Sequence, residues 1–400
     1  MKKLFILFFT VTSLNLSQAQ TDSVYHIGLI LPFQAASTTE KLEAYTNAHD
    51  LFTAQRIRLN DDAVISLDFY QGVLQALLEN ETGPSIELEV FDNWNSDSVT
   101  AEILKKPELK KLDLIIGSSS TSSAKLVADF CKQNKIVNVQ PFSPSKTLTS
   151  GNPYHLKLAP TIDAHVDALF NSMTDSFPGA NVIIYTPNVE KSTSIAARFD
   201  SLFKDYNETT TVNFKVALLN TKDMLLNGKK TTAQEQLSKK AENIIIITSF
   251  DESFINGNLR LLHDNLVTDS ITVYGMPTWL NGDILRLDYV NDFHTHLSDA
   301  FCIDSSRSQT REFMQHYYGH FSAEPTRFAY LGYDVSKFLL SNISDYGQDF
   351  LNHISTQHYN GTAYKFDIIK NSRPDGQTDF FENRYVNVLA VSNYQLTKVH

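Results

Sequence analysis

Short apolar runs recur along the chain from Tyr25, and longer segments with apolar residues three or four positions apart lie between them. The runs are typical of buried strands, and the spacing in the longer segments is typical of helices with one apolar face. Such an alternation of strands and helices indicates an α/β protein with parallel sheets. The predicted strands are Ile27 to Leu31, Ile86 to Phe91, Leu112 to Ile116, Ile136 to Val139, Val182 to Tyr185, Val212 to Leu218, Asn243 to Ile247 and Ile271 to Tyr274.

The clearest helical segment carries an apolar stripe at Leu67, Tyr70, Leu74, Leu77 and Leu78. Spacings of three and four residues put these side chains on one face of a helix, which we expect to pack on a sheet. Further helices are predicted at Thr100 to Lys111, Ser122 to Asn134, Ile162 to Ser176, Ser194 to Tyr206, Glu235 to Lys240, Arg311 to Phe321 and Tyr330 to Ser341.

Turn-forming residues divide the chain into two series of strands and helices. The stretch from Pro141 to Pro160 is rich in proline and glycine, which is typical of a connection rather than of a regular element. One series, Ile27 to Val139, precedes this stretch, and a second, Val182 to Tyr274, follows it. The sequence therefore predicts two doubly wound, Rossmann-like lobes. The late segments are two predicted strand regions, Tyr364 to Ile369 and Asn387 to Tyr394, and a turn-rich loop, Asn371 to Gln377.

The segment most informative for function runs from Leu114 to Ser123, where an apolar run and Gly117 lead into six consecutive serine and threonine residues. Open α/β sheets bind ligands beyond the carboxyl ends of their strands. Hydroxyls and helix-entry amides at such an end can hold a small polar or anionic group. Polar and aromatic residues also follow other predicted strands. The candidate ligand-binding residues are Ser118, Ser119, Ser120, Thr121, Ser122, Phe142, Ser143, Ser145, Tyr185, Thr248, Asp251, Thr278 and Trp279.

The same residues also have a structural interpretation. Serine and threonine stabilise turns and make loops soluble, and Asp251 is well placed to cap a helix that follows it. The sequence leaves both interpretations open for each residue. Only the clustering of hydroxyls at one strand end favours ligand binding.

The N-terminal pattern is typical of a secretory signal peptide that covers residues 1–19. Lys2 and Lys3 precede an apolar stretch from Leu4 to Val11, and small residues at Ser17 to Ala19 suit cleavage. No cysteine follows that position, which argues against a lipid anchor, and no later apolar run reaches the roughly 18 residues of a membrane span. We therefore expect a periplasmic or secreted protein without direct membrane insertion.

The charge and the cysteines exclude further classes. A formal net charge of −11 without a basic stripe makes nucleic acid an unfavourable partner. Two cysteines, Cys131 and Cys302, are too few for a disulfide scaffold. Cys131 continues an apolar helical series with Ala124 and Val127, which favours burial over a bridge to Cys302, although both remain open.

Catalytic and metal chemistry find little support. His294 and His296, and also His316 and His320, have spacings that can bind a metal, but no cysteine or carboxylate pattern completes a site. A zinc carrier or a hydrolase is therefore the weakest hypothesis. The Gly-x-Ser-x-Gly motif of serine hydrolases is absent from the sequence. We expect no catalytic residue, no metal and no cofactor, and hence no enzyme.

A series of motifs, taken in order, resembles the type I periplasmic binding proteins, a superfamily that includes branched-chain amino-acid binding proteins and receptor ligand-binding regions. Their order and spacing carry the resemblance rather than any single motif. The motifs are Ile27 to Phe33, Phe69 to Gly72, Phe91 to Asn93, Ile115 to Gly117 with the hydroxyls that follow, Pro141 to Pro144, Phe313, Tyr317, Glu324, Pro325, Ala329 and Gly332 to Asp334.

The resemblance implies two lobes that are joined by three crossover hinges and close on a ligand. On that basis we expect lobe 1 at residues 24–150 and 281–344, and lobe 2 at residues 151–280 and 345–400. The tail would thus return to lobe 2.

The resemblance also implies roles for two loops. In amino-acid-binding members, the loop that matches Ser118 to Ser123 holds the ligand carboxylate, with help from the loop that matches Phe142 to Ser145. The acidic residue that meets the ligand ammonium in those relatives has no counterpart in Tyr274 to Trp279. Asp251 or Glu252 could take its place.

The leading hypothesis is an extracytoplasmic solute-binding protein, active as a monomer. It would hold a small polar metabolite, amino-acid-like or otherwise carboxylate-bearing, in a cleft between its lobes and present it to a membrane ABC transporter. The alternative is a module of the same fold that acts in protein interaction or cell-envelope assembly, with a vestigial or repurposed cleft.

Overall fold

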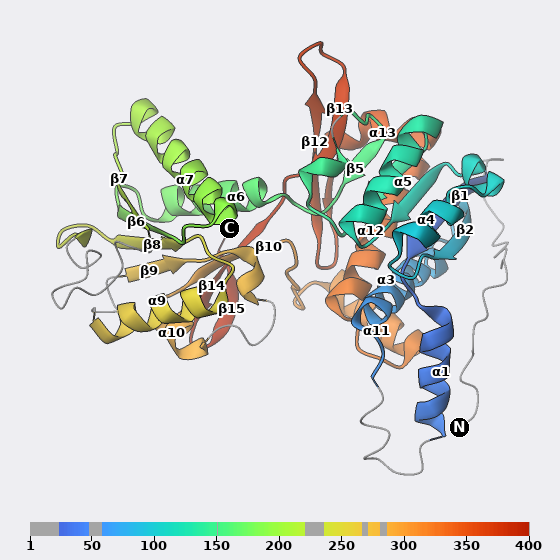
Figure 1. Ribbon diagram of the computed structural model, residues 1–400, viewed down its shortest axis with the longest axis horizontal. Helices are drawn as coiled ribbons and strands as arrows, with labels where there is room; N and C mark the ends of the chain where they lie inside the picture. The colour runs from blue at the N-terminus through green and yellow to red at the C-terminus, as the bar shows by residue number, and fades with distance from the viewer. Residues whose placement is uncertain are drawn as a thin grey trace. The chain divides into compact units, whose positions relative to one another are not determined.

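A computed structural model describes residues 24–47, 58–149, 151–220, 236–265, 271–280 and 286–399 (Figure 1). The chain forms two compact units. Unit 1 comprises Met1–Ala159 and Ile303–Arg384, and unit 2 comprises Pro160–Cys302 and Tyr385–His400. The chain therefore passes from one unit to the other three times. The expected signal peptide lies outside the described residues.

Unit 1 is built on an eight-stranded sheet of order β11-β12-β13-β5-β4-β3-β1-β2. Neighbours pair parallel from β2 through β1, β3, β4 and β5 to β13, whereas β12 pairs antiparallel with both β11 and β13. The strands are β1 (Val24–Leu31), β2 (Ser85–Asp92), β3 (Leu114–Gly117), β4 (Val137–Gln140), β5 (His155–Lys157), β11 (His358–Asn360), β12 (Lys365–Ser372) and β13 (Thr378–Asn383).

Helices cover this sheet. Ile30 and Ile115 of the sheet pack against Val127 and Cys131 of one helix, α5, in a fully apolar cluster. The helical elements of unit 1 are α1 (Ala35–Thr46), α3 (Asp61–Leu78), α4 (Asp97–Ile103), η1 (Pro107–Lys111), α5 (Thr121–Asn134), η2 (Lys146–Leu148), α11 (Ser308–Phe321), α12 (Arg327–Tyr346), η5 (Gly347–Asp349), α13 (Phe350–His353) and η6 (Ile354–Thr356).

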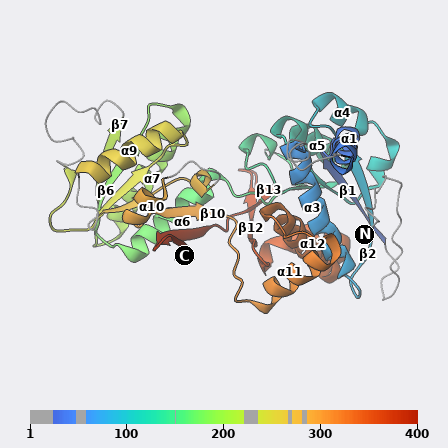
Figure 2. The ribbon, with the colours of Figure 1, turned by 90° about the horizontal axis from the view of Figure 1, so that it is seen from below.

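Two glycines let α3 and α12 pack backbone to backbone, side by side in Figure 2. A Cβ on Gly72 would lie 2.0 Å from the Ala329 carbonyl oxygen, and a Cβ on Gly332 would lie 2.0 Å from the Phe69 carbonyl oxygen. Any side chain at either position would therefore force the helices apart.

Unit 2 is built on a seven-stranded sheet of order β15-β14-β10-β9-β8-β6-β7. Its interior strand β8 is buried along its whole length and carries four consecutive isoleucines, Ile244 to Ile247, which is typical of a parallel strand covered on both faces. Figure 1 shows α6 and α7 on one side of this sheet and α9 and α10 on the other. The elements are α6 (Ile162–Ser176), β6 (Asn181–Thr186), α7 (Glu190–Thr209), β7 (Lys215–Asn220), β8 (Asn243–Ile247), α9 (Glu252–Asn265), β9 (Ile271–Tyr274), η4 (Pro277–Leu280), α10 (Leu287–Asp292), β10 (His296–Asp299), β14 (Asn387–Ser392) and β15 (Gln395–Lys398).

The predicted α/β class with two parallel-dominated sheets is confirmed, and the structure places each of the eight predicted strands within a few residues of its expected position. Local chemistry explains several differences. The expected helix from Thr100 to Lys111 is broken before Pro107. The expected connection Pro141 to Pro160 contains η2 and the short strand β5. The expected helix Glu235 to Lys240 begins outside the described residues, and its last part is a turn closed by the Ser238 hydroxyl, which accepts hydrogen bonds from the amides of Lys240 and Ala241.

The unit boundaries also differ from those expected. Residues 151–159, expected in lobe 2, join unit 1, because β5 pairs with β4. Residues 345–384 also join unit 1, because β13 pairs with β5 and because the Asp334 carboxylate accepts hydrogen bonds from the amides of Thr362, Ala363 and Tyr364 at 2.7 to 2.9 Å. The stretch from Arg286 to Cys302 stays with unit 2, because β10 pairs with β14 and β9. Pairing partners distant in the sequence decided the last two assignments.

Candidate functional site

The hydroxyl segment lies at the carboxyl end of β3 in unit 1, as its sequence predicts. Gly117 ends the strand with φ +119°, and a Cβ there would lie 2.2 Å from the Ile30 carbonyl oxygen, so no other residue suits this exit. Ser118 is fully buried, and its hydroxyl accepts a hydrogen bond from Asn93 Nδ2 at 2.8 Å. Ser118 is therefore part of the support beneath the site.

The hydroxyls after Ser118 form the entry to α5. Ser120 caps the helix by accepting a hydrogen bond from the Ser123 amide at 3.3 Å, and Ser119 is half-buried beside it. Thr121 and Ser122 occupy the first turn and are exposed. Amides of a first turn have no partner within the helix, and the helix dipole adds positive potential there. This surface, which we call the α5 entry (Ser119 to Ser122), suits a small anionic group.

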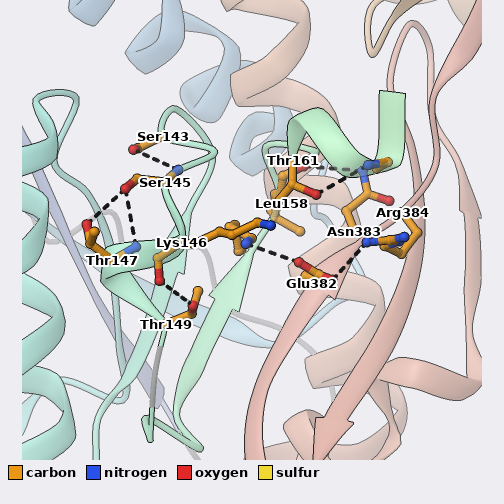
Figure 3. Close-up of polar contacts among 12 residues, drawn as sticks. Ser143, Ser145, Lys146, Thr147, Thr149, Leu158, Thr161, Glu382, Asn383 and Arg384 are labelled. Atoms are coloured by element: carbon orange, nitrogen blue, oxygen red, sulfur yellow. Dashed lines mark hydrogen bonds and ion pairs between the residues drawn. The ribbon is translucent and has the colours of Figure 1, made fainter. Parts of the chain in front are cut away.

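The loop after β4 lies against the α5 entry. Thr121 Oγ1 and Ser143 Oγ are 3.2 Å apart, and the half-buried Phe142 ring packs on Phe69 with 4.8 Å between centroids. Ser145 caps η2 by accepting a hydrogen bond from the Thr147 amide at 3.3 Å (Figure 3). The structure thus brings together all eight predicted residues of unit 1.

Gln140 holds the two loops together and was not among the predicted residues. Its Oε1 accepts hydrogen bonds from the amides of Phe142 and Ser143 at 2.9 and 3.1 Å. Its Nε2 donates to the Ser118 carbonyl oxygen at 3.0 Å. The available sequence signal was a glutamine directly after the predicted strand Ile136 to Val139, because such an amide needs several partners once it is buried, as the structure shows for Gln140.

A buried ion pair lies at the same edge of the sheet, on β5 and β13. Lys157 Nζ is 3.1 Å from Glu382 Oε2, and the two side chains are 1% and 8% exposed. Arg384 Nη1 is 3.3 Å from Glu382 Oε1 (Figure 3). Burial lowers the pKa of Lys157, and Glu382 opposes that effect. Sequence analysis did not single out this pair, although a lysine between Leu156 and Leu158 is unusual in a strand.

The predicted residues of unit 2 have mainly internal roles. Tyr185 and Trp279 are buried in the apolar core, and Trp279 Nε1 donates to the Ser249 carbonyl oxygen at 3.0 Å. Thr248 is fully buried and donates from Oγ1 to the Tyr185 carbonyl oxygen at 3.3 Å. These three side chains stabilise the strand ends from inside unit 2 and are not accessible to a ligand.

Asp251 and Thr278 are the two predicted residues of unit 2 that are exposed. Asp251 Oδ1 accepts a hydrogen bond from the Phe254 amide at 2.8 Å, so it caps α9, which is the structural use that the sequence had left open. Thr278 lies in η4.

Three of the four histidines with suggestive spacings make contacts that join elements of the fold. His316 Nδ1 is 2.9 Å from Glu79 Oε1, and His320 Nδ1 is 2.7 Å from Gln75 Oε1, which ties α11 to α3. The His296 ring stacks on Tyr274 at 4.7 Å. Within the described part of the chain, no three histidine, cysteine or acidic side chains gather closely enough to hold a metal ion.

Among the described residues, neither cysteine takes part in a disulfide bond. Cys131 is fully buried beneath α5, and burial raises its pKa. The expected burial of Cys131 is therefore confirmed. Among the residues that the structure covers, no helix is both long enough and apolar enough to span a bilayer.

Several solved structures share this fold at low sequence identity. A candidate branched-chain amino acid ABC transporter protein from Rhodospirillum rubrum aligns with a TM-score of 0.65 and 14% identity over 94% of this chain and 100% of its own. An ABC transporter substrate-binding protein from Desulfitobacterium hafniense, in complex with Leu, gives 0.57 and 13% over 94% and 100%. A solute-binding protein from R. palustris, in complex with benzoate, gives 0.51 and 12% over 94% and 96%.

The sequence itself identifies the family. No curated protein matches the chain significantly. The profile of the periplasmic binding proteins, however, matches residues 70–379, which is most of the chain and includes the α5 entry, the loop after β4 and Lys157. With two parallel-dominated α/β sheets and hydroxyls at a strand end, the chain belongs to the periplasmic binding protein family.

Proposed function

We propose that this protein is an extracytoplasmic solute-binding protein that captures a small carboxylate-bearing metabolite and delivers it to an ABC transporter. The observation that carries this proposal is the α5 entry, where exposed hydroxyls surround the first turn of a helix. Anions bind at helix N-termini because amides and dipole both favour negative charge there. The protein would bind its ligand without transforming it, and we propose no catalytic residue.

The chemistry of unit 2 narrows the ligand class. The segment from Tyr274 to Trp279 contains no acidic residue, and the Asp251 carboxylate already caps α9. Of the acidic residues considered for a ligand ammonium, only the exposed Glu252 is left, so a carboxylate without a neighbouring ammonium fits better than a standard amino acid. Two of the similar structures hold leucine and benzoate, and both compounds bear a carboxylate.

The N-terminal sequence pattern supports this role. The pattern of residues 1–19 is that of a secretory signal peptide, and we propose that the mature protein acts as a monomer in the periplasm or outside the cell. A solute-binding protein has to meet its ligand on that side of the membrane.

The test is to identify the compound that the purified protein carries. The protein would be isolated without denaturation and weighed by native mass spectrometry, and the released compound would be identified after unfolding. We expect one carboxylate-bearing compound per chain. The proposal fails if no compound is bound and if no member of a panel of carboxylic acids, amino acids and sugars raises the unfolding temperature.

The buried state of Tyr185, Thr248 and Trp279 favours one second candidate, a module for protein interaction or envelope assembly. If unit 2 offers a ligand few groups, the cleft could be vestigial. In that case, removing the hydroxyls of Thr121 and Ser122 would leave the binding of a partner protein unchanged. In a solute-binding protein, the same change would abolish binding of the small molecule.

A further inference from the structure

Unit 1 has a cavity at the edge of its sheet opposite to the α5 entry. The cavity measures about 470 Å³. It is lined by the first residues of three parallel strands, Leu114 of β3, Val137 of β4 and Thr378 of β13, together with Tyr25 near the start of β1. Parallel strands have all their amino ends at one edge, so this cavity and the α5 entry lie at opposite edges of the sheet.

The cavity has an apolar floor and a polar mouth. Leu112, Ile136 and Phe350 are buried and contribute to the floor, while η5 and the start of α13 form one side. The half-buried Tyr154 precedes β5 and lines another side. Cavities of a few hundred Å³ that combine apolar walls with a few polar groups are typical of sites for small molecules.

The polar groups at the mouth are unequally satisfied. The ammonium groups of Lys110 and Lys135 have no hydrogen bond or ion pair with any residue that the structure describes. The carboxylates are engaged: Asp113 Oδ2 accepts a hydrogen bond from the His26 amide at 2.8 Å, and Asp349 Oδ2 lies 3.1 Å from His353 Nε2. Among the charged groups of the lining, the two that have no such partner are therefore both cationic.

We propose that this cavity, the pole site (Tyr25, Lys110, Lys135, Tyr154 and Phe350), binds a small organic anion that carries a carboxylate or a phosphate on an apolar ring. The anionic group would lie at the two ammonium groups, and the ring would contact Tyr154 and the floor at Phe350. Since the lining comes from segments far apart in the sequence, a bound anion would tie them together and stabilise unit 1. The pole site does not depend on the proposed transport function.

The experiment is a calorimetric titration of the full chain with benzoate, phenyl phosphate and inorganic phosphate. Lys110→Met combined with Lys135→Met removes both charges at exposed positions, so folding should be preserved. Two controls are matched to it. Lys239→Met with Lys240→Met neutralises two exposed lysines of unit 2, and Thr121→Val with Ser122→Ala alters the α5 entry.

We expect benzoate or phenyl phosphate to bind saturably, at least tenfold more weakly to the Lys110/Lys135 variant and with unchanged affinity to the Lys239/Lys240 variant. In the α5-entry variant the pole site should remain, so a binding phase lost there alone belongs to the transport site. Protection from hydrogen exchange at residues 110–114 and 348–352 would locate the ligand. The proposal is overturned if no probe binds saturably, if both lysine variants lose affinity equally, or if inorganic phosphate binds as tightly as phenyl phosphate.

Discussion

The segments that follow the strands of the two units are similar in composition but differ in structure. Both carry hydroxyls and aromatics after buried strands. In unit 1, Thr121 and Ser122 are exposed in the first turn of a helix, whereas in unit 2 Thr248 and Trp279 are buried and donate hydrogen bonds to the carbonyl oxygens of Tyr185 and Ser249. Composition at a strand end therefore does not by itself distinguish a ligand-binding surface from its support.

The difference follows from which residues satisfy the buried backbone. In unit 1, the side-chain amides of Gln140 and Asn93 bond the loops beneath the α5 entry, and Thr121 and Ser122 stay exposed above them. In unit 2, no such pair of amides serves the described loops after β8 and β9, and Thr248 and Trp279 make the bonds themselves. Buried polar groups must be paired, and the residues that pair them lose their access to a ligand.

The largest effect should come from the core of unit 2. Trp279→Ala removes a fully buried ring and its hydrogen bond to Ser249, and it should lower the free energy of unfolding by about 3–5 kcal/mol. Thr278→Ala, at the exposed neighbour, should change it by less than about 0.5 kcal/mol. Urea denaturation followed by circular dichroism measures both. Equal effects would show that Trp279 is not a core residue.

A loss of stability of comparable size is expected in unit 1 when its buried ion pair is broken. Lys157→Met leaves the Glu382 carboxylate buried with less compensation and should cost about 3 kcal/mol. Adding Glu382→Leu should recover most of that loss. Lys125→Met breaks an exposed pair with Asp129 and should cost less than about 0.5 kcal/mol in the same denaturation experiment. If the double variant were no more stable than the single one, the pair would not be the cause.

Each unit contains a buried histidine that should make its stability depend on pH. Burial lowers the pKa of His155 to about 3 and that of His165 to about 4. The folded state holds both rings neutral, so their contribution to stability is complete above pH 6.5, the usual histidine value, and is lost as the pH falls toward 4 and 3.

Leucine substitutions separate these contributions. The ring nitrogens of His155 have no hydrogen-bond partner among the described residues, so His155→Leu should reduce the loss of stability between pH 7.5 and pH 4 without a cost at pH 7.5. His165→Leu should cost about 1 kcal/mol at pH 7.5, because Ser298 Oγ loses its partner at 3.0 Å. Urea titrations at the two pH values give the comparison, and an unchanged pH dependence in His155→Leu would contradict it.

The smallest expected change concerns single hydroxyls. Thr248→Val removes a buried donor to the Tyr185 carbonyl and should lower the free energy of unfolding by about 1 kcal/mol. The affinity of the folded protein for its ligand should not change. Thr121→Val, on the exposed surface of unit 1, should show the reverse pattern: weaker binding of the carried compound at unchanged stability. Thermal unfolding with and without that compound distinguishes the two patterns, and identical behaviour would remove the contrast between the units.

The sequence predicted the fold well because the fold depends on local patterns. Apolar runs such as Asn243 to Ile247 and the helix from Ile162 to Ser176 were located to the residue. The unit boundaries depended on pairings between distant segments, such as Phe381 with Leu156, for which a single sequence holds no local signal. The strand β5 has three residues and lies in a proline-rich stretch, so its periodicity was too short to detect.

The candidate site was predicted in part for the same reason. The hydroxyls from Ser118 to Ser122 and the loop with Phe142 follow their strands directly, so sequence adjacency was enough to place them. Tyr185 and Thr248 point into the protein. Whether a side chain at a strand end does so depends on the hydrogen-bond acceptors and the packing space that the folded protein places beside it, as the Tyr185 carbonyl oxygen does for Thr248. The partnership of Lys157 with Glu382 joins two segments more than 200 residues apart, and no pattern within either segment points to the other.

The most direct measurement of the central claim is the affinity of the carried compound for a variant of the α5 entry and for a matched control. Thr121→Val with Ser122→Ala removes two exposed hydroxyls from the first turn of α5, and Thr193→Val with Ser194→Ala removes an exposed threonine and serine from α7 of unit 2. We predict that isothermal titration will show at least tenfold weaker binding to the first variant and wild-type affinity for the second. Equal affinity of both variants for the compound would contradict the account.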